Sequence, residues 1–343
     1  MDQNDPTPET SPTALTPSEG LPLSRFMVDP DLLRDHLEAL ADNTLKGYGS
    51  DLADYSRWLG RTRSHQWDDP KLIASYFRAL ANADAAYATI ERRKAAISKL
   101  AEIETADGHR DPYQNPARHP RVLIALKALR NQLPAQQTEA RPLTGERLVQ
   151  VLSAMTTQTL KNQRDTAMLL TGFYGALRVS ELVRLTPNDI KFTPQGMIVS
   201  ITPSRSNQKT VHIAIHAHPR SDWDPVGHLQ SWINTLNTTD LQPNLGLWRR
   251  LTKADRPWSP QTAITPKTIE RIITERVLKA NLSHPHQYTT HSLRAGFITT
   301  AQNLGINEAS IMNHTRHRTL TAIRRYNPTT ELWHQSPTAQ LTL

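Results

Sequence analysis

Five polar side chains in the second half of the sequence have the chemistry needed to break and rejoin a phosphodiester bond. They are two arginines, two histidines and one tyrosine, in three separate segments: Arg178, His291, Arg294, His317 and Tyr326. Guanidinium groups bind non-bridging phosphate oxygens and stabilise the extra charge of a pentavalent transition state. Histidines relay protons near neutral pH, and adjacent positive charge makes a tyrosine hydroxyl a better nucleophile. The set therefore predicts phosphoryl transfer through an ester of tyrosine.

The spacing within two of these segments predicts helices. Glu181 follows Arg178 by three residues in GALRVSEL, and Arg294 follows His291 by three residues in THSLRAG. Residues at this spacing share one face of a helix. Taken singly, each feature has a simpler explanation: a surface ion pair, a solvated helix face, or a half-buried core tyrosine. The combination is what indicates chemistry.

The order and spacing of the three segments resemble those of the tyrosine recombinase (phage integrase) family. The resemblance rests on GALRVSEL after RDTAMLLTGFY, on the H-x-x-R pattern, and on a histidine nine residues before the tyrosine of an RRY sequence. It covers residues 143–326, and the helical region before them resembles the family's core-binding domain. It implies a Cre-like or Xer-like site-specific recombinase. Such an enzyme cleaves and rejoins duplex DNA through a 3′-phosphotyrosine intermediate, in integration, excision or resolution.

The resemblance also implies a role for each residue of the set. Arg178 and Arg294 would clamp the scissile phosphate, and Tyr326 would be the nucleophile. His291 would relay a proton or bind a phosphoryl oxygen. His317 would occupy the position where the family has histidine or tryptophan.

Three further residues are compared with the family's pattern. Glu181 matches an acidic residue that orients the first arginine. The family's general acid is a hairpin lysine, and the corresponding position holds Arg205, whose pKa is too high for easy proton donation. We therefore expect Lys209 to protonate the leaving 5′ oxygen, the alternative being an ordinary exposed lysine. Arg316 replaces the glycine that usually precedes the histidine; it adds a cation and is expected to alter that turn.

A metal ion or cofactor is not expected. Five histidines could suggest a metal site: His284, His286, His291, His314 and His317. No carboxylate or thiolate accompanies them, and neighbouring arginines would repel a divalent ion. The sequence has no GxxxxGK phosphate-binding loop. Transfer that conserves bond energy in a phosphotyrosine needs neither metal nor ATP.

The amino-acid composition indicates the cellular compartment and the kind of molecule that the protein binds. The chain has 343 residues and no cysteine, which excludes disulfides and thiolate chemistry and favours a reducing compartment such as the cytoplasm. No apolar run is long enough to cross a membrane. The whole chain carries +8, and residues 1–28 carry −3, so the remainder carries +11. Such an excess of positive charge is typical of proteins that bind a polyanion.

The pattern of apolar residues predicts a mainly α protein with two domains. We expect a disordered arm at 1–28, an all-helical core-binding domain at 29–132, a linker at 133–142, a catalytic domain at 143–330 and a tail at 331–343. Helices are expected at 43–59, 70–81, 87–104, 119–132, 144–155, 162–174, 178–185, 225–236, 266–281, 291–303, 307–313 and 318–326. One small antiparallel sheet is expected in the catalytic domain, from a hairpin of strands at 197–204 and 209–216.

The partner implied by the resemblance is double-stranded DNA with specific recombination sites, bound by a homo-tetramer on two paired sites. Four cations on two helices of the first domain are candidates for DNA contact: Lys46, Arg92, Arg93 and Lys94. A solvated helix face is the alternative for the last three. The tail at 331–343 carries apolar residues that could dock on a neighbouring subunit.

Two other functions stay open on the sequence. A type IB topoisomerase shares the pocket and the nucleophile, although the core-binding-like domain argues against it. A DNA-binding relative that has lost catalysis is the second alternative, and the replacements at Arg205 and Arg316 are what favour it.

Overall fold

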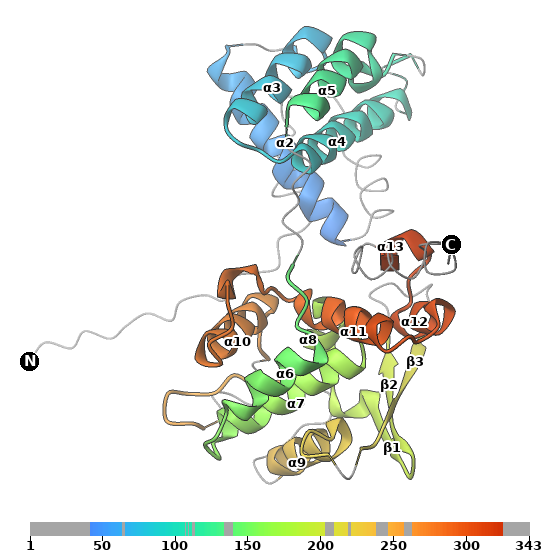
Figure 1. The fold of residues 1–343 in the computed structure, drawn as a ribbon. Coiled ribbons are helices and arrows are strands. Elements are labelled where there is room, and N and C mark those ends of the chain that lie inside the picture. Colours follow the sequence, from blue (N-terminus) through green and yellow to red (C-terminus); the bar gives the residue numbers. More distant parts are fainter. Residues whose placement is uncertain are drawn as a thin grey trace, which may run out of the picture. The chain divides into compact units, whose positions relative to one another are not determined.

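The chain folds as two compact units, Met1–Gln137 and Thr138–Leu343. The computed structural model describes residues 42–63, 66–106, 108, 110, 111, 114–133, 140–202, 209–218, 221–237, 246–256 and 263–324. The predicted arm at 1–28, Arg205, Tyr326 and the tail at 331–343 lie outside these residues. Figure 1 shows the helices and strands of each unit.

Helices make up the secondary structure of the described part of the first unit, as the apolar pattern predicts. They are α2 (Asp42–Arg61), α3 (Pro70–Asn82), α4 (Tyr87–Ala106) and α5 (Pro120–Gln132), with a short 3-10 helix, η2 (Pro116–Arg118). The start of α3 is encoded locally, because the Asp69 carboxylate accepts the amide of Lys71 (2.7 Å) and Pro70 needs no acceptor. This supports the expected mainly α class.

An aromatic cluster fills the core between these helices. Tyr55, Tyr76 and Phe77 are fully buried, and Tyr55 and Tyr76 pack with ring centroids 4.8 Å apart. The buried Tyr55 hydroxyl donates to the carbonyl of Trp67 at 2.7 Å, which avoids an unsatisfied polar group. Each fully buried aromatic side chain contributes about 1.5–3 kcal/mol to folding.

The second unit is also mainly helical. Its helices are α6 (Gly145–Ser153), α7 (Leu160–Tyr174), α8 (Val179–Arg184), α9 (Pro225–Asn237), α10 (Pro266–Lys279), α11 (Ser292–Asn303), α12 (Glu308–Thr315) and α13 (Leu320–Arg324), with 3-10 helices η3 (Pro187–Asp189) and η4 (Pro285–Gln287). Figure 1 shows α6, α7 and α11 close together in the middle of this unit, and the contacts of α11 with both other helices agree. The sequence predicted each α-helix to within a few residues.

A three-stranded antiparallel sheet, in the order β1-β2-β3, lies in the second unit. The strands are β1 (Ile190–Thr193), β2 (Gly196–Ile201) and β3 (Val211–His216). The hairpin of β2 and β3 was predicted, and Ile201 pairs with Val211 at the end next to the connecting loop. The third strand, β1, was not predicted. It has four residues, and Pro194 follows it directly, so it is too short to show a clear alternation.

A buried ion cluster ties α7 to α10. Asp165 is fully buried and receives two guanidinium groups: Arg164 through Nε (2.9 Å) and Nη2 (2.6 Å), and Arg276 through Nε (2.9 Å) and Nη2 (2.5 Å). A buried carboxylate needs such compensation, because an unpaired charge costs several kcal/mol in the interior. The cluster therefore fixes α7, the helix that leads into the GALR segment.

Among the described helices, none is both long and apolar enough to cross a membrane.

Candidate active site

The turn after α7 is the centre of the candidate site. Its Ala176 has a left-handed backbone (φ 43°), and the Leu177 amide donates to the carbonyl of Gly172 (3.1 Å), which closes the helix end. A left-handed alanine is uncommon and costs about 1–2 kcal/mol. The turn is buried, and it presents the Ala176 carbonyl to side chains from other helices.

Helix α8 begins directly after this turn and carries the predicted Arg178–Glu181 pair. The Glu181 carboxylate accepts the backbone amide of Arg178 (2.8 Å) and its Nη1 atom (2.9 Å). The Arg178 side chain is 46% exposed, whereas Glu181 is only 10% exposed. Glu181 therefore binds one nitrogen of the Arg178 guanidinium, and the rest of the group remains accessible to a phosphate.

Helix α11 carries the other predicted arginine. Arg294 is 3% exposed and donates through Nη1 to the carbonyl of Ala176 (2.6 Å), and through Nη2 to the carbonyl of Thr315. Two carbonyls from distant segments thus fix the plane of the guanidinium fork. His291 is the residue before α11, one turn from Arg294, and its side chain is exposed.

A close backbone contact holds α11 in place. A Cβ atom added at Gly296 would lie 1.9 Å from the carbonyl oxygen of Leu143 and 2.4 Å from its carbonyl carbon, far inside any real contact distance. The amide of Leu143 also donates to the carbonyl of Ser292 (2.9 Å). Only glycine lets the chain at Leu143 lie against α11 here.

The turn after α12 brings in His317. The hydroxyl of the buried Thr315 donates to the carbonyl of Ile311 (2.7 Å), and its oxygen lies 2.7 Å from Nδ1 of His317. Because the hydroxyl proton is used, Nδ1 of His317 is the donor and Nε2 is left as an acceptor in the neutral ring. Nε2 lies 3.3 Å from Nη2 of Arg294, so the two predicted residues are in contact.

Arg316 precedes His317 and has a left-handed backbone (φ 59°, ψ 41°). Its Nη2 donates to Oε2 of Glu181 (3.0 Å) and lies 3.5 Å from the Ala176 carbonyl. The amide of His317 donates to the carbonyl of Met312 (3.2 Å), which closes α12 as a glycine-ended helix would be closed. The added cation lies against Glu181.

The hydrogen bonds and charges around Glu181 determine whether its carboxyl group is ionised. Burial works to raise the pKa of the Glu181 carboxyl. The bond from the Arg178 amide and the charges of Arg316 and Arg178 outweigh burial, so this pKa is held below its usual value. Burial lowers the pKa of the Arg316 guanidinium, with Glu181 opposing and Arg178 adding to that shift. Glu181 is therefore an anion between two cations at neutral pH.

His314 belongs to the same region, although no role was predicted for it apart from the rejected metal site. Its Nε2 donates to the carbonyl of Tyr174 (2.7 Å), and its ring stacks on Phe297 with centroids 4.8 Å apart. Burial lowers the pKa of the His314 ring, the bond to the Tyr174 carbonyl opposes this, and the charges of Arg316 and Arg294 lower the pKa further. The neutral ring supports the turn from beneath.

Three members of the predicted set are not brought into this network by the described residues: His291, Lys209 and Tyr326. Lys209 is exposed and lies two residues before β3, at the hairpin end of the sheet. Tyr326 lies outside the described residues. Among the described residues, no group of three or more His, Cys, Asp or Glu side chains is arranged to hold a metal ion.

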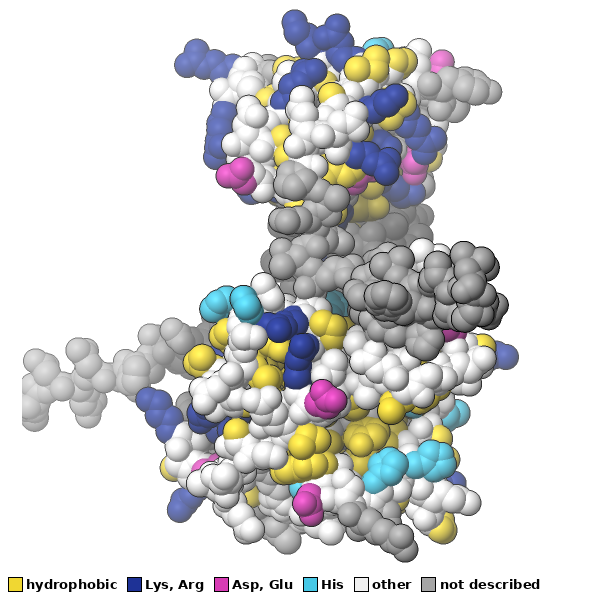
Figure 2. All heavy atoms as spheres, viewed as in Figure 1, with side chains coloured by type: hydrophobic (Ala, Val, Ile, Leu, Met, Phe, Trp, Pro, Cys, Tyr) yellow, Lys and Arg dark blue, Asp and Glu magenta, His cyan; other side chains and the backbone are white. Residues whose placement is uncertain are grey.

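The four cations predicted for DNA contact differ in their surroundings within the first unit. Lys46 is exposed on α2, and Lys94 is half-buried on α4. Arg92 is 50% exposed and its Nη2 lies 3.0 Å from Oδ1 of Asp51. Arg93 is 18% exposed: its Nη1 donates to Asp54 and to the Tyr76 hydroxyl (2.7 Å). Figure 2 shows Lys and Arg side chains over much of this unit's visible face.

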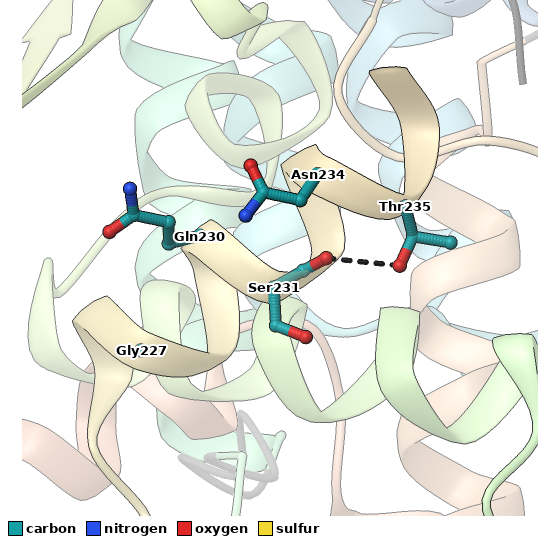
Figure 3. A pocket seen from close by; sticks show the side chains of 5 residues that line it. All are labelled: Gly227, Gln230, Ser231, Asn234 and Thr235. Carbon is teal, nitrogen blue, oxygen red and sulfur yellow. Dashed lines mark hydrogen bonds between the residues drawn. The ribbon is translucent and has the colours of Figure 1, made fainter. Parts of the chain in front are cut away.

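A surface pocket lies along one face of α9 (Figure 3). Small and polar residues line it: Gly227, Gln230, Ser231, Asn234 and Thr235. The Thr235 hydroxyl donates to the Ser231 carbonyl (3.0 Å), a bond within one helix. The pocket holds no charged side chain and shares no residue with the network around Glu181.

Comparison with known proteins places this network in a family. The sequence profile of the phage integrase family matches residues 141–331, more than half of the chain. The chain belongs to the phage integrase family. All the described residues of the network lie inside the matched range.

Two curated relatives of the family are similar over most of the chain. An integrase/recombinase described as a XerD homolog from Selenomonas ruminantium is 33% identical over 293 residues, covering 83% of this chain and 81% of the relative. A tyrosine recombinase from Thermosipho africanus (strain TCF52B) is 24% identical over 276 residues, covering 76% of this chain and 83% of the relative. The chain is thus a tyrosine site-specific recombinase, and neither alternative function is favoured.

Solved structures of family members have the same fold. The XerH recombinase in a post-cleavage complex gives a TM-score of 0.62 at 12% identity, covering 87% of this chain and 80% of that one. A lambda integrase fragment gives a TM-score of 0.59 at 17% identity, covering 88% of this chain and 95% of that one. At such identities the likeness extends to the fold alone.

Proposed function

We propose that the cluster of cations around Ala176 and Glu181 binds the scissile phosphate of a DNA duplex while Tyr326 attacks it. One observation carries the proposal. Arg294 and Arg316 both approach the carbonyl of Ala176, and Arg316 and Arg178 both contact Glu181. Positive charge from α8, α11 and the turn after α12 therefore gathers at one place, as the stabilisation of a pentavalent phosphorane requires.

The reaction assigns each group a step. The Tyr326 oxygen bonds to phosphorus and the bond from phosphorus to the 5′ oxygen breaks, which leaves a 3′-phosphotyrosine and a 5′-hydroxyl. Arg178 and Arg294 bind the non-bridging oxygens, and His291 takes part in transfer of the phenolic proton. Lys209 protonates the leaving oxygen. Rejoining reverses these steps with a different 5′-hydroxyl, so no metal, ATP or other cofactor is consumed.

His317 and Glu181 act through the arginines in this scheme. His317 contacts Arg294 at 3.3 Å and is itself held by Thr315 (2.7 Å). Glu181 holds the guanidinium of Arg178, with Oε1 2.9 Å from Nη1. Fixing both guanidinium groups before substrate binds lowers the cost of organising them in the transition state.

The substrate is proposed to be double-stranded DNA carrying specific recombination sites. Several structural relatives are described as bound to such DNA, XerH to a difH substrate and lambda integrase to a core site. In this chain, Lys46, Arg92 and Lys94 are the proposed contacts of the first unit with the phosphate backbone. Arg93 is already engaged by Asp54 and Tyr76, so we assign it the support of this surface.

The proposed assembly is a homo-tetramer on two paired sites in the cytoplasm, with the tail at 331–343 docking on a neighbouring subunit. Removing residues 331–343 is then expected to abolish recombination between two sites while single-site DNA binding persists. Gel shift and a two-site recombination assay measure the two properties. Unchanged recombination by the truncated chain would refute the role of the tail.

Covalent trapping on suicide duplexes tests the central proposal. Wild-type protein, Tyr326→Phe and Tyr288→Phe are incubated with nicked duplexes covering candidate sites, without added metal, and run on a denaturing gel. Tyr288 is the matched control, because its ring is 1% exposed and its hydroxyl is buried.

We expect an adduct with the wild type and with Tyr288→Phe, and none with Tyr326→Phe. An adduct that survives in Tyr326→Phe would place the nucleophile elsewhere. Specific binding without an adduct at any site, in all three proteins, would instead indicate a relative that has lost catalysis.

A further inference from the structure

The backbone conformation and the burial of Arg316 both cost free energy of folding. Its backbone is left-handed, a conformation that costs an L-residue other than glycine free energy. Its side chain is only 14% exposed. Within the described part of the chain, the buried Nε and Nη1 atoms have no hydrogen-bond acceptor. Glycine would adopt the same turn without these costs, so the turn conformation alone does not explain an arginine here.

The contacts of Arg316 reach the two groups that hold the site arginines. Its Nη2 atom lies 3.0 Å from Oε2 of Glu181, while Oε1 of the same carboxylate accepts Nη1 of Arg178 at 2.9 Å. The same Nη2 lies 3.5 Å from the carbonyl of Ala176, which Arg294 contacts at 2.6 Å. Arg316 is thus bonded to the supports of both phosphate-binding arginines.

The sequence separation makes this link significant. Arg316 is 135 residues from Glu181 and 140 residues from Ala176, so its side chain joins the turn after α12 to the turn before α8. His317 follows directly in the chain and contacts Arg294. Among the described residues, Arg316 is the only side chain of the turn after α12 that pairs with Glu181. Its loss would remove this link to the α8 segment.

We infer that Arg316 is a positioning residue of the cleavage reaction, which holds Glu181 and the Ala176 carbonyl so that Arg178 and Arg294 are aligned on one phosphate. The inference rests on the proposed function and adds a residue to it. The guanidinium is the active part; the left-handed backbone is the conformation needed to bring it there. Loss of the side chain should therefore slow cleavage without weakening the binding of DNA.

Three substitutions separate the side chain from the backbone. Arg316→Gly removes the guanidinium and relieves the left-handed strain, Arg316→Ala removes the guanidinium and keeps the strain, and Arg316→Lys keeps a cation that can reach Glu181. Arg271→Ala is the control for the loss of one cation, because Arg271 is 71% exposed on α10 and pairs only loosely with Glu275 (3.7 Å).

Single-turnover cleavage of a suicide duplex and gel-shift affinity are measured for each variant. We expect cleavage by the Gly and Ala variants to fall by about tenfold or more, since a charge-assisted bond to the support of Arg178 is lost. Affinity should change by less than about threefold, because the contact is not with DNA. The Lys variant should recover part of the rate, and Arg271→Ala should cleave at the wild-type rate.

Thermal unfolding distinguishes this role from a purely structural one. The Gly variant should melt a few degrees above the Ala variant, on the order of 2–4 °C, because only the backbone strain differs. Their cleavage rates should nevertheless be equal. In a Glu181→Gln background, Arg316→Ala should have a much smaller effect on the rate than in the wild type.

The outcomes are separable. A Gly variant that cleaves as fast as the wild type would overturn the inference, because the side chain would then be dispensable. Additive effects of Arg316→Ala and Glu181→Gln would also overturn it. If the wild type itself forms no tyrosine adduct, the proposed function fails, and the inference about Arg316 fails with it for that different reason.

Discussion

Nη1 of Arg294 donates to the carbonyl oxygen of Ala176 over 2.6 Å, across 118 residues of sequence. Ala176 is in a left-handed turn, so its carbonyl no longer points along the axis of α7 and can accept a bond from another helix. The position of a buried arginine is thus decided by the end of a different helix. This relationship makes the geometry of the site sensitive to changes that leave its total charge untouched.

Arg294→Lys is expected to abolish most activity while the fold survives. A lysine keeps the charge, but its single ammonium cannot bond to the carbonyls of both Ala176 and Thr315 and also present a planar fork to phosphate. Single-turnover cleavage should fall by about 100-fold or more. The melting temperature is the control measurement. A lysine variant that cleaves within threefold of the wild type would show that the bidentate geometry is unimportant.

Glu181→Gln is expected to weaken stability in a pH-dependent way. The folded-state pKa of Glu181 lies below its ordinary value of 4.5, so the carboxylate stabilises the fold fully above pH 4.5, and that contribution is lost as pH falls through the lower folded value. At pH 7 the variant should be about 1–3 kcal/mol less stable. Urea denaturation at pH 7 and below pH 4 measures both limits. A difference that persists at the lowest pH would contradict this explanation.

Thr315→Val removes the group that orients His317 with little change in shape. The Thr315 hydroxyl oxygen lies 2.7 Å from Nδ1 of His317, and valine removes this contact. Cleavage should fall by about tenfold, a loss of about 1.4 kcal/mol of transition-state stabilisation. Thr315→Ser keeps the hydroxyl and should cleave close to the wild-type rate. Equal rates for the Val and Ser variants would mean that the hydroxyl does not act on His317.

Gly296→Ala is expected to destabilise the second unit severely. The new methyl group would lie 1.9 Å from the Leu143 carbonyl oxygen, and the backbone on either side would have to move. The cost should be about 3 kcal/mol or more. The control is Gly227→Ala in α9, where the added Cβ meets only the Asp224 side chain, 3.1 Å from a carboxylate oxygen and not against backbone; we expect a change within about 1 kcal/mol there. Similar losses for both variants would argue against the close contact.

The cations of the first unit are expected to separate into two kinds. Lys46→Ala should weaken DNA binding at low salt and reduce the slope of log affinity against log salt by about one, as expected for a phosphate contact. Arg93→Ala should instead destabilise the first unit by about 1–3 kcal/mol, because Asp54 and the Tyr76 hydroxyl lose a half-buried partner. Titrations at several salt concentrations and thermal unfolding measure the two effects. Identical behaviour of the two variants would contradict the assignment.

Local signals made most of the fold predictable. Asp69 and Pro70 mark the start of α3, and Gly175 follows the last residue of α7, so these ends could be read directly from the sequence. Strand β1 was missed because Ile190–Thr193 is too short for its alternation to be recognised. Its stability comes from pairing with β2, where Ile190 lies opposite Val199, and such pairing has no local signature.

The candidate site was predictable in its residue types and less so in its support. Arg178 and Glu181 are three residues apart, and helical spacing indicates their contact. The bonds from Arg294 and Arg316 to Ala176 link residues more than 100 positions apart. Nothing in the sequence marks the left-handed backbone of Ala176 or Arg316, because neither residue is glycine and the surrounding structure imposes the conformation. The sequence therefore singled out Arg294 and Arg316 but gave no sign of the Ala176 carbonyl that both approach.

The contact of Leu143 with α11 has a consequence for dividing the protein into fragments. Arg141 is anchored as well, through its amide to the carbonyl of Gln287 (2.9 Å) and through Nη1 to the carbonyl of Ser283 (2.9 Å). The segment 141–143 is thus an N-terminal clasp on the helix that carries His291 and Arg294. A fragment intended to contain the second unit alone has to be cut before Arg141. A cut after Leu143 would remove these bonds and the backbone that lies against Gly296.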